Sequence, residues 1–464
     1  MVPYDGIGQF PGTLVWQASY VILVRNHWRH YGDAAVVKQH YPNLLKLMRH
    51  FQRTFVNTTT GLADLEGHGD WVCVGPNGQG QMGSPGSCAR TPASLVTAFY
   101  WIQCLGFMAD LSAVAGQPAS EVSQWNARRT AAVKAFHFRY FDERAQAYAP
   151  VNWPHMPGQT WEVWPSEPHG SQTSLAMALA LGAPPDEATR ASTIEALVQN
   201  VVQNDGHLTV GMFGMQVVLP MLTAAGRADL ALSMLLQDTY PSLGHMMQQN
   251  QTTLCEDWTC GAHVTDGPGS GDLPTSQSNH RSLNHIMARL ALEYCVFKRM
   301  LRVEPSHTDA PHCRSHSQSR TAAPPVPIAL PLRTACLTRH ILAQYGAFHT
   351  WMITRLGGLD TVSNATCTGW RHIIVAPEIH AVARLRAGGY SLQTRFGLAA
   401  VSWAYDTATK QLRTNVTVPT GSTAEVVHER EMPAVAATGA GSSSLHAVYE
   451  GESQVWSRSG GTSF

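Results

Sequence analysis

The stretch from Asn250 to Trp258 contains the residue types that could cleave a bond to a sugar. Its sequence, Asn-Gln-Thr-Thr-Leu-Cys-Glu-Asp-Trp, places the carboxylates of Glu256 and Asp257 beside the indole of Trp258. A carboxylate can orient a water molecule or protonate a leaving oxygen, and an aromatic face packs on the C–H groups of a sugar. The same pair also fits two solvated charges in a loop, so the interpretation depends on the rest of the chain.

Three further motifs accompany this stretch in order along the chain. They are His207–Leu208–Thr209–Val210–Gly211, Tyr240–Pro241–Ser242–Leu243–Gly244–His245 and Ser282–Leu283–Asn284–His285. Together with Thr252–Trp258 they resemble the α-L-rhamnosidase family of six-hairpin glycosidases, whose motifs are usually written hLxTGxxG, YPSWG, TTxWExW and SLNH. Four ordered motifs within about eighty residues are far more specific than any one of them.

Two shorter stretches extend the resemblance. Gly69–Asp70–Trp71 is similar to the GDW motif of the family, which lines the sugar pocket, and Ser171–Gln172–Thr173 is similar to its TQT motif at the start of a helix. Without the resemblance, Asp70 would fit equally well as the cap of a turn and Trp71 as a cover of the core.

The resemblance implies removal of a terminal α-L-rhamnose from a glycoside, with inversion of configuration. Glu256 matches the glutamate of TTxWExW and would be the general base. The sequence departs from the family at Cys255 and Leu243, where the family has tryptophan. The substrate-binding residues implied by the resemblance are Asp70, Trp71, Trp258 and His285, and a lone histidine such as the last would otherwise fit a helix cap or a core hydrogen bond.

The general acid is missing from this pattern. Inversion needs two carboxyl groups about 6.5–9.5 Å apart, one as acid and one as base. The acid of the family lies in a DxxxRxxxGWxGD motif, which no segment here resembles. We therefore expect a chain truncated at its N-terminal side, with impaired hydrolysis. Two alternatives stay open: a non-catalytic sugar-binding protein of the same fold, and another (α/α)6 glycosidase or lyase that acts on a different sugar.

The charge balance gives no electrostatic case for nucleic acid or an anionic membrane as partner. Lys and Arg total 32, as do Asp and Glu, and charged residues make up only 14% of the 464 residues. A neutral ligand, such as a rhamnose-containing glycoside or polysaccharide, fits better. Metal clusters, phosphate loops and nucleophile elbows do not stand out, so we expect no cofactor and no metal. The sequence does not indicate the oligomeric state.

Cysteines and glycosylation motifs bear on the compartment. Cys73 with Cys88, and Cys255 with Cys260, each bracket a loop and can pair in an oxidising compartment. The start of the chain lacks the basic and apolar regions of a signal peptide, so the compartment stays open. Four Asn-x-Ser/Thr triplets are compatible with secretion, and they begin at Asn57, Asn250, Asn364 and Asn415.

Apolar side chains recur at helical spacing over the first 300 residues and do not alternate with period two, so the region that carries these residues is predicted to be all-α. Asp33 is expected to cap a helix at its start and Gly182 to cap one at its end. Successive hairpins predict an (α/α)6 toroid with its site at the loop end, and the resemblance implies the same fold. Fewer than twelve helices are counted, so the toroid can be incomplete at its N-terminal side. Helices are predicted over 13–31, 94–115, 120–141, 186–203, 211–225 and 227–237.

The chain divides into five parts by composition and pattern. Residues 288–344 interrupt the family pattern and are rich in proline and serine, so they are interpreted as an insertion that is largely disordered. Short runs with period two predict a small antiparallel β-sandwich after Trp370. The predicted parts are the toroid over 1–287, the insertion over 288–344, the final helix and linker of the toroid over 345–369, the sandwich over 370–450 and a disordered tail over 451–464.

Overall fold

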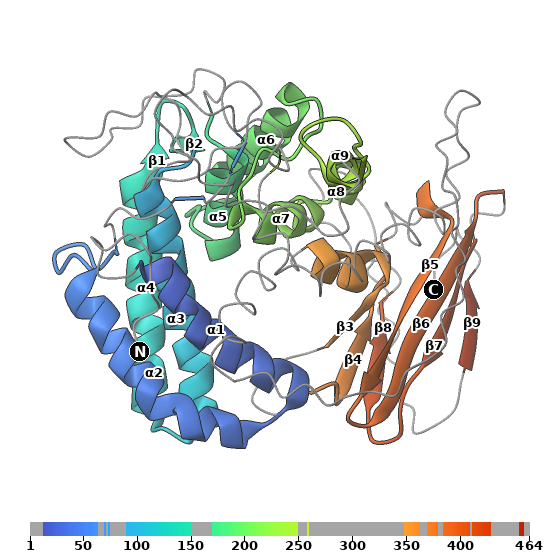
Figure 1. Cartoon of the computed structure of the whole chain (residues 1–464), viewed down its shortest axis with the longest axis horizontal. Coiled ribbons are helices and arrows are strands. Elements are labelled where there is room, and N and C mark those ends of the chain that lie inside the picture. The colour runs from blue at the N-terminus through green and yellow to red at the C-terminus, as the bar shows by residue number, and fades with distance from the viewer. Residues whose placement is uncertain are drawn as a thin grey trace, which may run out of the picture.

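Helical hairpins form the first half of the protein, as seen in the computed structural model (Figure 1). The structure describes residues 13–63, 69–70, 73–74, 90–149, 169–248, 258, 348–361, 369–378, 384–408, 411–427 and 454–458. Within these ranges, each odd-numbered helix from α1 to α7 packs against the helix that follows it. The helices are α1 (Leu14–Tyr31), α2 (Ala34–Thr54), α3 (Ala93–Val114), α4 (Ala119–Tyr140), α5 (Gln172–Leu181), α6 (Glu187–Gln203), α7 (Val218–Ala224), α8 (Ala228–Leu235) and α9 (Leu243–Gln248).

The odd-numbered helices also pack on one another in chain order. Helix α1 contacts α3, α3 contacts α5 and α5 contacts α7, so they form an inner layer. The even-numbered partners lie outside them, and the hairpins follow an arc from α1 to α8 (Figure 1). An inner layer of sequential helices, each backed by an outer one, is the arrangement expected of helical hairpins in a toroid. The mainly helical toroid predicted from the sequence is therefore confirmed.

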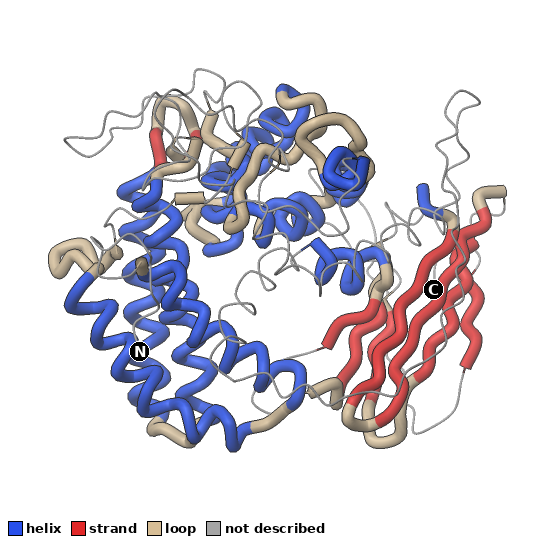
Figure 2. The backbone as a smooth tube through the Cα atoms, viewed as in Figure 1, coloured by secondary structure: helices blue, strands red, loops and turns tan. Residues whose placement is uncertain are grey.

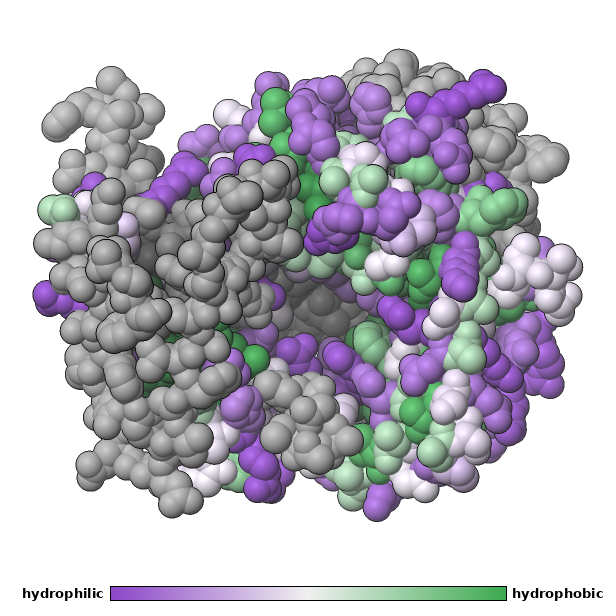
Figure 3. Space-filling model, turned by 180° about the vertical axis from the view of Figure 1, so that it is seen from behind, coloured by the Kyte–Doolittle hydropathy of each residue, from purple (hydrophilic) through white to green (hydrophobic). Residues whose placement is uncertain are grey.

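The burial of each helix follows from its pattern of apolar residues. In α2, Val37, Tyr41, Leu44, Met48 and Phe51 share one face, and all five are buried. Helix α3 is apolar on nearly every side. It is long and apolar enough to cross a membrane, but 78% of its most apolar window is buried inside the protein, as in a central core helix. Seen from behind, the described surface mixes hydrophilic and hydrophobic residues (Figure 3).

The predicted helix caps at Asp33 and Gly182 are confirmed. The carboxylate of Asp33 accepts hydrogen bonds from the backbone N–H groups of Ala35 and Val36, which have no partner inside the first turn of α2. Gly182 ends α5 with φ +67°, a left-handed conformation that glycine adopts readily.

Two predictions for the helical half are wrong. The all-α interpretation missed a hairpin of β1 (Phe141–Asp142) and β2 (Ala147–Tyr148), because strands of two residues are too short to show alternation. The helix predicted over 211–225 begins only at Val218, after a 3-10 turn at Gly214–Gln216. Backbone N–H groups of residues 211, 213 and 214 bond a buried carboxylate instead.

Two small sheets form the C-terminal part (Figure 2). Leu359, Ile373 and Val375 of the three-stranded sheet share a core with Val401 and Val416 of the four-stranded sheet, so the sheets pack face to face. The three-stranded sheet has the order β3-β4-β8, with β3 (Leu359–Thr361), β4 (His372–Val375) and β8 (Thr423–Val426). The other has the order β5-β6-β7-β9, with β5 (Ala387–Thr394), β6 (Gly397–Asp406), β7 (Gln411–Thr417) and β9 (Gln454–Arg458).

The predicted small antiparallel sheets are confirmed, with three differences in detail. Strands β4 and β8 pair in parallel, which the long connection through the strands of the other sheet allows. Strand β3 begins before residue 370, the predicted start of the sandwich. Strand β9 falls in the predicted disordered tail, yet its backbone pairs with β7. Residues 288–344 lie outside the described residues, and the division of the chain into domains stays a prediction.

The two halves contact each other through α1 and through η3 (Met352–Leu356), a short π-helical segment. The Trp351 indole donates to the Thr223 hydroxyl of α7 at 2.7 Å, and the Trp403 indole donates to the Leu356 carbonyl at 2.8 Å. At the end of α1, Arg29 lies 3.0 Å from the Asp360 carboxylate. These contacts fix the sheets against the helices.

Candidate active site

The fully buried carboxylate of Asp70 lies where three segments of the toroid meet. Its Oδ2 accepts hydrogen bonds from the Thr173 hydroxyl at 2.5 Å and from the Gly211 backbone N–H at 2.8 Å. Its Oδ1 accepts from the backbone N–H groups of Phe213 and Gly214, both at 2.9 Å. Asp70 is 0% exposed. These five residues, named here the Asp70 cage, join the 69–70 segment, the start of α5 and the 211–214 loop.

The local sequence explains how the cage forms. Ser171 caps α5 by accepting from the backbone N–H of Ser174, so Thr173 lies in the first turn of the helix. Gly214 allows the loop to come close, since a Cβ there would lie 2.1 Å from Thr173 Oγ1 and 2.8 Å from Asp70 Oδ2. Any side chain at Gly214 would therefore collide with the cage.

Electrostatics favour a carboxylate with many donors at this position. Burial raises the pKa of Asp70, while the hydrogen bonds from Thr173 and the three backbone amides act in the opposite direction. All four partners use N–H or O–H groups as donors, which suits the ionised form of the side chain. Burial also raises the pKa of the neighbouring Tyr100, and the Asp70 charge adds to that shift. Tyr100 therefore stays a neutral phenol.

A second set of contacts holds the chain at Val210 and just before it. The Gln172 side chain donates to the His207 carbonyl at 2.9 Å and accepts from the Thr209 backbone N–H at 3.1 Å. The Trp258 indole donates to the Val210 carbonyl at 2.7 Å, and Trp258 is only 4% exposed. Trp258 is thus bonded to the residue that directly precedes the 211–214 loop.

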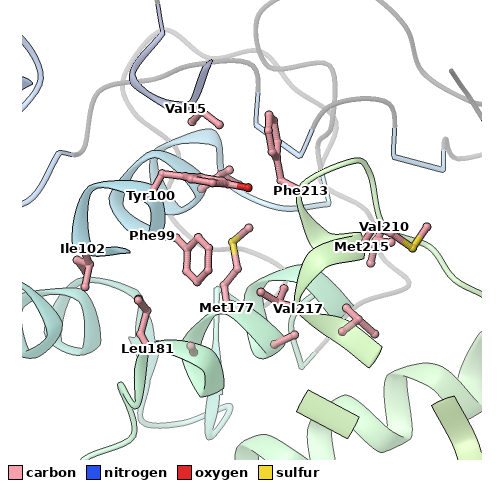
Figure 4. Close-up of a cluster of buried hydrophobic side chains, with 14 of the residues drawn as sticks. Val15, Phe99, Tyr100, Ile102, Met177, Leu181, Val210, Phe213, Met215 and Val217 are labelled. Atoms are coloured by element: carbon pink, nitrogen blue, oxygen red, sulfur yellow. The ribbon is translucent and has the colours of Figure 1, made fainter. Parts of the chain in front are cut away.

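Phe213 connects the cage to the inner helices. Its ring lies between Trp16 of α1 and Tyr100 of α3, with centroid distances of 5.4 Å to each and edge-on geometry. Figure 4 shows Phe213 and Tyr100 above a layer that includes Phe99 and Met177. Trp16 is only half-buried, whereas Phe213 and Tyr100 are buried. The loop is therefore packed on one side and hydrogen-bonded on the other.

The Tyr240–His245 motif lies at the start of α9. The Tyr240–Pro241 peptide bond is cis, and the Ser242 hydroxyl accepts from the His245 backbone N–H at 2.9 Å. The ring of His245 meets that of Tyr240 edge-on at 5.3 Å, and burial lowers the pKa of His245. Leu243, where the family has tryptophan, is buried.

The structure brings together two of the residues that the sequence assigned to the site. Asp70 and Trp258 both bond the 210–214 loop. Trp71, Glu256 and His285 lie outside the described residues, so their roles stay predictions. The polar contact of Asp70 and the stacking of Trp258 with a sugar also stay predictions.

Thr173, Phe213 and Gly214 are part of the cage, although none of them was predicted as a site residue. Thr173 lies in the TQT-like stretch, and Phe213 and Gly214 follow directly after the 207–211 motif. Among the residues that the structure describes, no group of three His, Cys, Asp or Glu side chains could hold a metal ion. Cys73 takes part in a disulfide, and its predicted partner Cys88 lies outside the described residues, so their pairing stays a prediction.

Comparison with protein families accounts for both halves of the chain. A family model described as the bacterial alpha-L-rhamnosidase 6 hairpin glycosidase domain matches residues 1–296, which is more than half of the chain. The chain belongs to this α-L-rhamnosidase family. The bacterial alpha-L-rhamnosidase C-terminal domain matches residues 358–440. The recognition of an α-L-rhamnosidase-like glycosidase from its ordered motifs is confirmed.

The matching relatives of this α-L-rhamnosidase-family chain are distant and much longer. An alpha-L-rhamnosidase of Streptomyces avermitilis is 24% identical over 247 residues, covering 53% of this chain and 20% of the relative. One of Formosa agariphila is 22% identical over 402 residues, covering 86% of this chain and 32% of the relative. The chain thus spans a third or less of the length of these two relatives.

Solved structures of α-L-rhamnosidases share the fold of this family member. The Aspergillus terreus enzyme has a TM-score of 0.63 at 17% identity, covering 97% of this chain and 40% of that one. The Dictyoglumus thermophilum enzyme has a TM-score of 0.58 at 18% identity, covering 90% and 35%. A Streptomyces avermitilis α-L-rhamnosidase solved with L-rhamnose has a TM-score of 0.53 at 18% identity, covering 88% and 28%.

Proposed function

We propose that this chain binds a terminal α-L-rhamnose and takes part in its hydrolytic removal from a glycoside or polysaccharide. The observation that supports the proposal is the meeting of family motifs at the Asp70 cage. Asp70 belongs to the GDW-like stretch, Thr173 to the TQT-like stretch and Trp258 to the TTxWExW-like stretch, and all contact the 210–214 loop or its partners. Motifs far apart in the sequence thus converge at one end of the inner helices.

Glu256 is the proposed general base. It precedes the anchored Trp258 by two residues, and a carboxylate in that role activates a water molecule on the face of the sugar opposite the leaving group. Attack from that face inverts the configuration. The reaction also needs an acid to protonate the leaving oxygen, and no segment of these 464 residues resembles the acid motif of the family. We propose that hydrolysis by this chain alone is slow for that reason.

The test is hydrolysis of an aryl α-L-rhamnoside by the full chain and by Glu256→Gln. Removal of a general base is expected to lower kcat by about 10²–10⁴-fold. Proton NMR of the first sugar released identifies its anomer, and inversion predicts β-L-rhamnose from the α-linked substrate. Glu195→Gln is the matched control, because Glu195 is an exposed glutamate of α6 whose partner is Gln199 of the same helix.

Other outcomes would contradict a part of this proposal or favour one of the alternative functions. Equal rates for the chain and for Glu256→Gln would contradict the role of the base, and release of the α anomer would contradict inversion. L-rhamnose binding by calorimetry, without turnover in either protein, would favour the non-catalytic sugar-binding protein. Turnover of other glycosides alone would assign the chain a different sugar.

A further inference from the structure

We infer that Asp70 is a positioning residue, which holds the 210–214 loop and through it Trp258, rather than a residue that contacts the sugar. The inference rests on the proposed function, because that function gives Trp258 its place at the site. It reassigns the aspartate of the GDW-like stretch from substrate binding to support of the site.

The first step of the inference is that the acceptor sites of the Asp70 carboxylate are already occupied by hydrogen bonds. An ionised carboxylate has about four acceptor sites, two on each oxygen. At Asp70 each oxygen already accepts two hydrogen bonds, and the side chain is 0% exposed. A sugar hydroxyl could bond Asp70 only by displacing Thr173 or a backbone amide. The geometry therefore suits a fixed support.

The second step of the inference is the connection from Asp70 to Trp258. Gly211, whose N–H bonds Asp70, directly follows Val210, whose carbonyl accepts from the Trp258 indole at 2.7 Å. A shift of the loop would move that acceptor and release the buried indole. The Asp70 cage therefore holds Trp258, which stands two residues after the proposed base in the sequence.

Independent contacts hold the neighbouring residues of this loop, so we expect the effect of Asp70 to be separable from folding. Gln172 holds residues 207 and 209 without using Asp70, and Phe213 packs between Trp16 and Tyr100. Loss of the carboxylate therefore frees the amides of 211, 213 and 214 while these other contacts persist.

The experiment compares the full chain with Asp70→Asn and with the milder Thr173→Val. An asparagine presents an NH₂ group to donors that need an acceptor, whereas Thr173→Val removes one of the four hydrogen bonds. Hydrogen exchange of the 211, 213 and 214 amides is expected to become about 10- to 100-fold faster in Asp70→Asn, since hydrogen bonds to charged groups are strong. In protein labelled with 5-fluorotryptophan, the Trp258 resonance, identified with Trp258→Phe, should shift.

Asp186→Asn is the matched control. Asp186 also accepts from a backbone N–H, that of Thr189 at the start of α6, but it is exposed and asparagine caps a helix equally well. It should change neither the exchange of the loop amides nor the fluorine spectrum. Should Asp70→Asn fail to fold, Thr173→Val supplies the same measurements with three of the four hydrogen bonds left.

Activity separates positioning from sugar contact. A positioning role predicts a lower kcat in Asp70→Asn together with faster exchange of the loop amides, and no further loss of kcat when the change is added to Glu256→Gln. A weaker Kd with unchanged amide exchange would overturn the inference in favour of direct contact. If the chain itself shows no turnover, the proposed function fails, and the exchange and fluorine measurements still decide the positioning role.

Discussion

Burial of the Asp70 carboxylate is compensated by four donors drawn from two segments, the start of α5 and the 211–214 loop. A buried charge is unfavourable unless it is paired or fully hydrogen-bonded. Three of the donors are backbone N–H groups, which most substitutions in the 211–214 loop would leave in place. A substitution at Gly214 would therefore disturb the cage by steric collision rather than by loss of a hydrogen bond.

Gly214→Ala is expected to destabilise the protein by about 1–3 kcal/mol, the range for overpacking a tight core. The new Cβ would meet the Thr173 hydroxyl and the Asp70 carboxylate at distances that side chains cannot adopt. Urea unfolding followed by circular dichroism measures the change. Gly106→Ala is the control, since its Cβ would meet only the flexible Arg129 side chain at 3.1–3.2 Å, and alanine favours helix α3. Equal destabilisation by both substitutions would contradict this explanation.

Residue types pointed to Asp70 and Trp258, but the sequence could not give their partners. Asp70 bonds Thr173 at a separation of 103 residues and Gly214 at a separation of 144. Periodicity and turn rules act over a few residues, so contacts at such separations have no local signature. The resemblance named the stretches that meet, and only the structure shows which atoms bond.

The phenol of Tyr41 connects three helices by hydrogen bonds. The Tyr41 hydroxyl of α2 donates to the Glu121 carboxylate of α4 at 2.5 Å and lies 2.5 Å from the Ser112 hydroxyl of α3. Burial, together with the hydrogen bond to Glu121, raises the pKa of Tyr41 to about 12. The neutral phenol therefore stabilises the folded helices.

This raised pKa predicts a loss of stability in alkali. The unfolded chain releases the Tyr41 proton near pH 10, whereas the folded chain keeps it until about pH 12. The stabilisation is therefore full below pH 10 and is lost as the pH rises from about 10 to 12. The urea midpoint of the wild type should fall more steeply over this interval than that of Tyr41→Phe. Tyr31→Phe, at a tyrosine that is 61% exposed, should behave like the wild type.

Helical elements were predictable because their signals are local. Apolar spacing and the capping residues Asp33 and Gly182 fixed the helix positions and ends. The signals failed at the 211–217 loop, where a distant carboxylate takes the amides, and at the two-residue strands β1 and β2. Runs with period two predicted the sheets after Trp370, but alternation does not identify which strands pair, so the parallel pairing of β4 with β8 was not predicted.

Across the whole molecule, a small set of contacts joins the helices to the sheets. The end of α1 bonds the sheet region through Arg29, whose carbonyl also accepts from the Gly369 backbone N–H at 2.9 Å. Tyr31 contributes its carbonyl to Arg395 at 3.0 Å. The ion pair of Arg29 with Asp360 is only partly exposed, with side-chain exposures of 29% and 27%.

A double-mutant cycle measures that ion pair. Arg29→Met, Asp360→Asn and the double variant are expected to give a coupling energy of about 0.5–1 kcal/mol, since partly exposed pairs are weak. The coupling should decrease at high salt because ions screen the charges. Urea unfolding of the four proteins provides the values. A coupling of zero at low salt would show that this ion pair does not help to hold the two halves together.

The bonds at the end of α1 also bear on the order in which the protein is made. Arg29 and Tyr31 leave the ribosome more than 300 residues before Asp360 and Arg395, with which they bond. Because a nascent chain folds as it emerges, the hairpins of the toroid can assemble while the end of α1 still lacks its partners. The bonds at the end of α1 can form only after Asp360 and Arg395 have been translated.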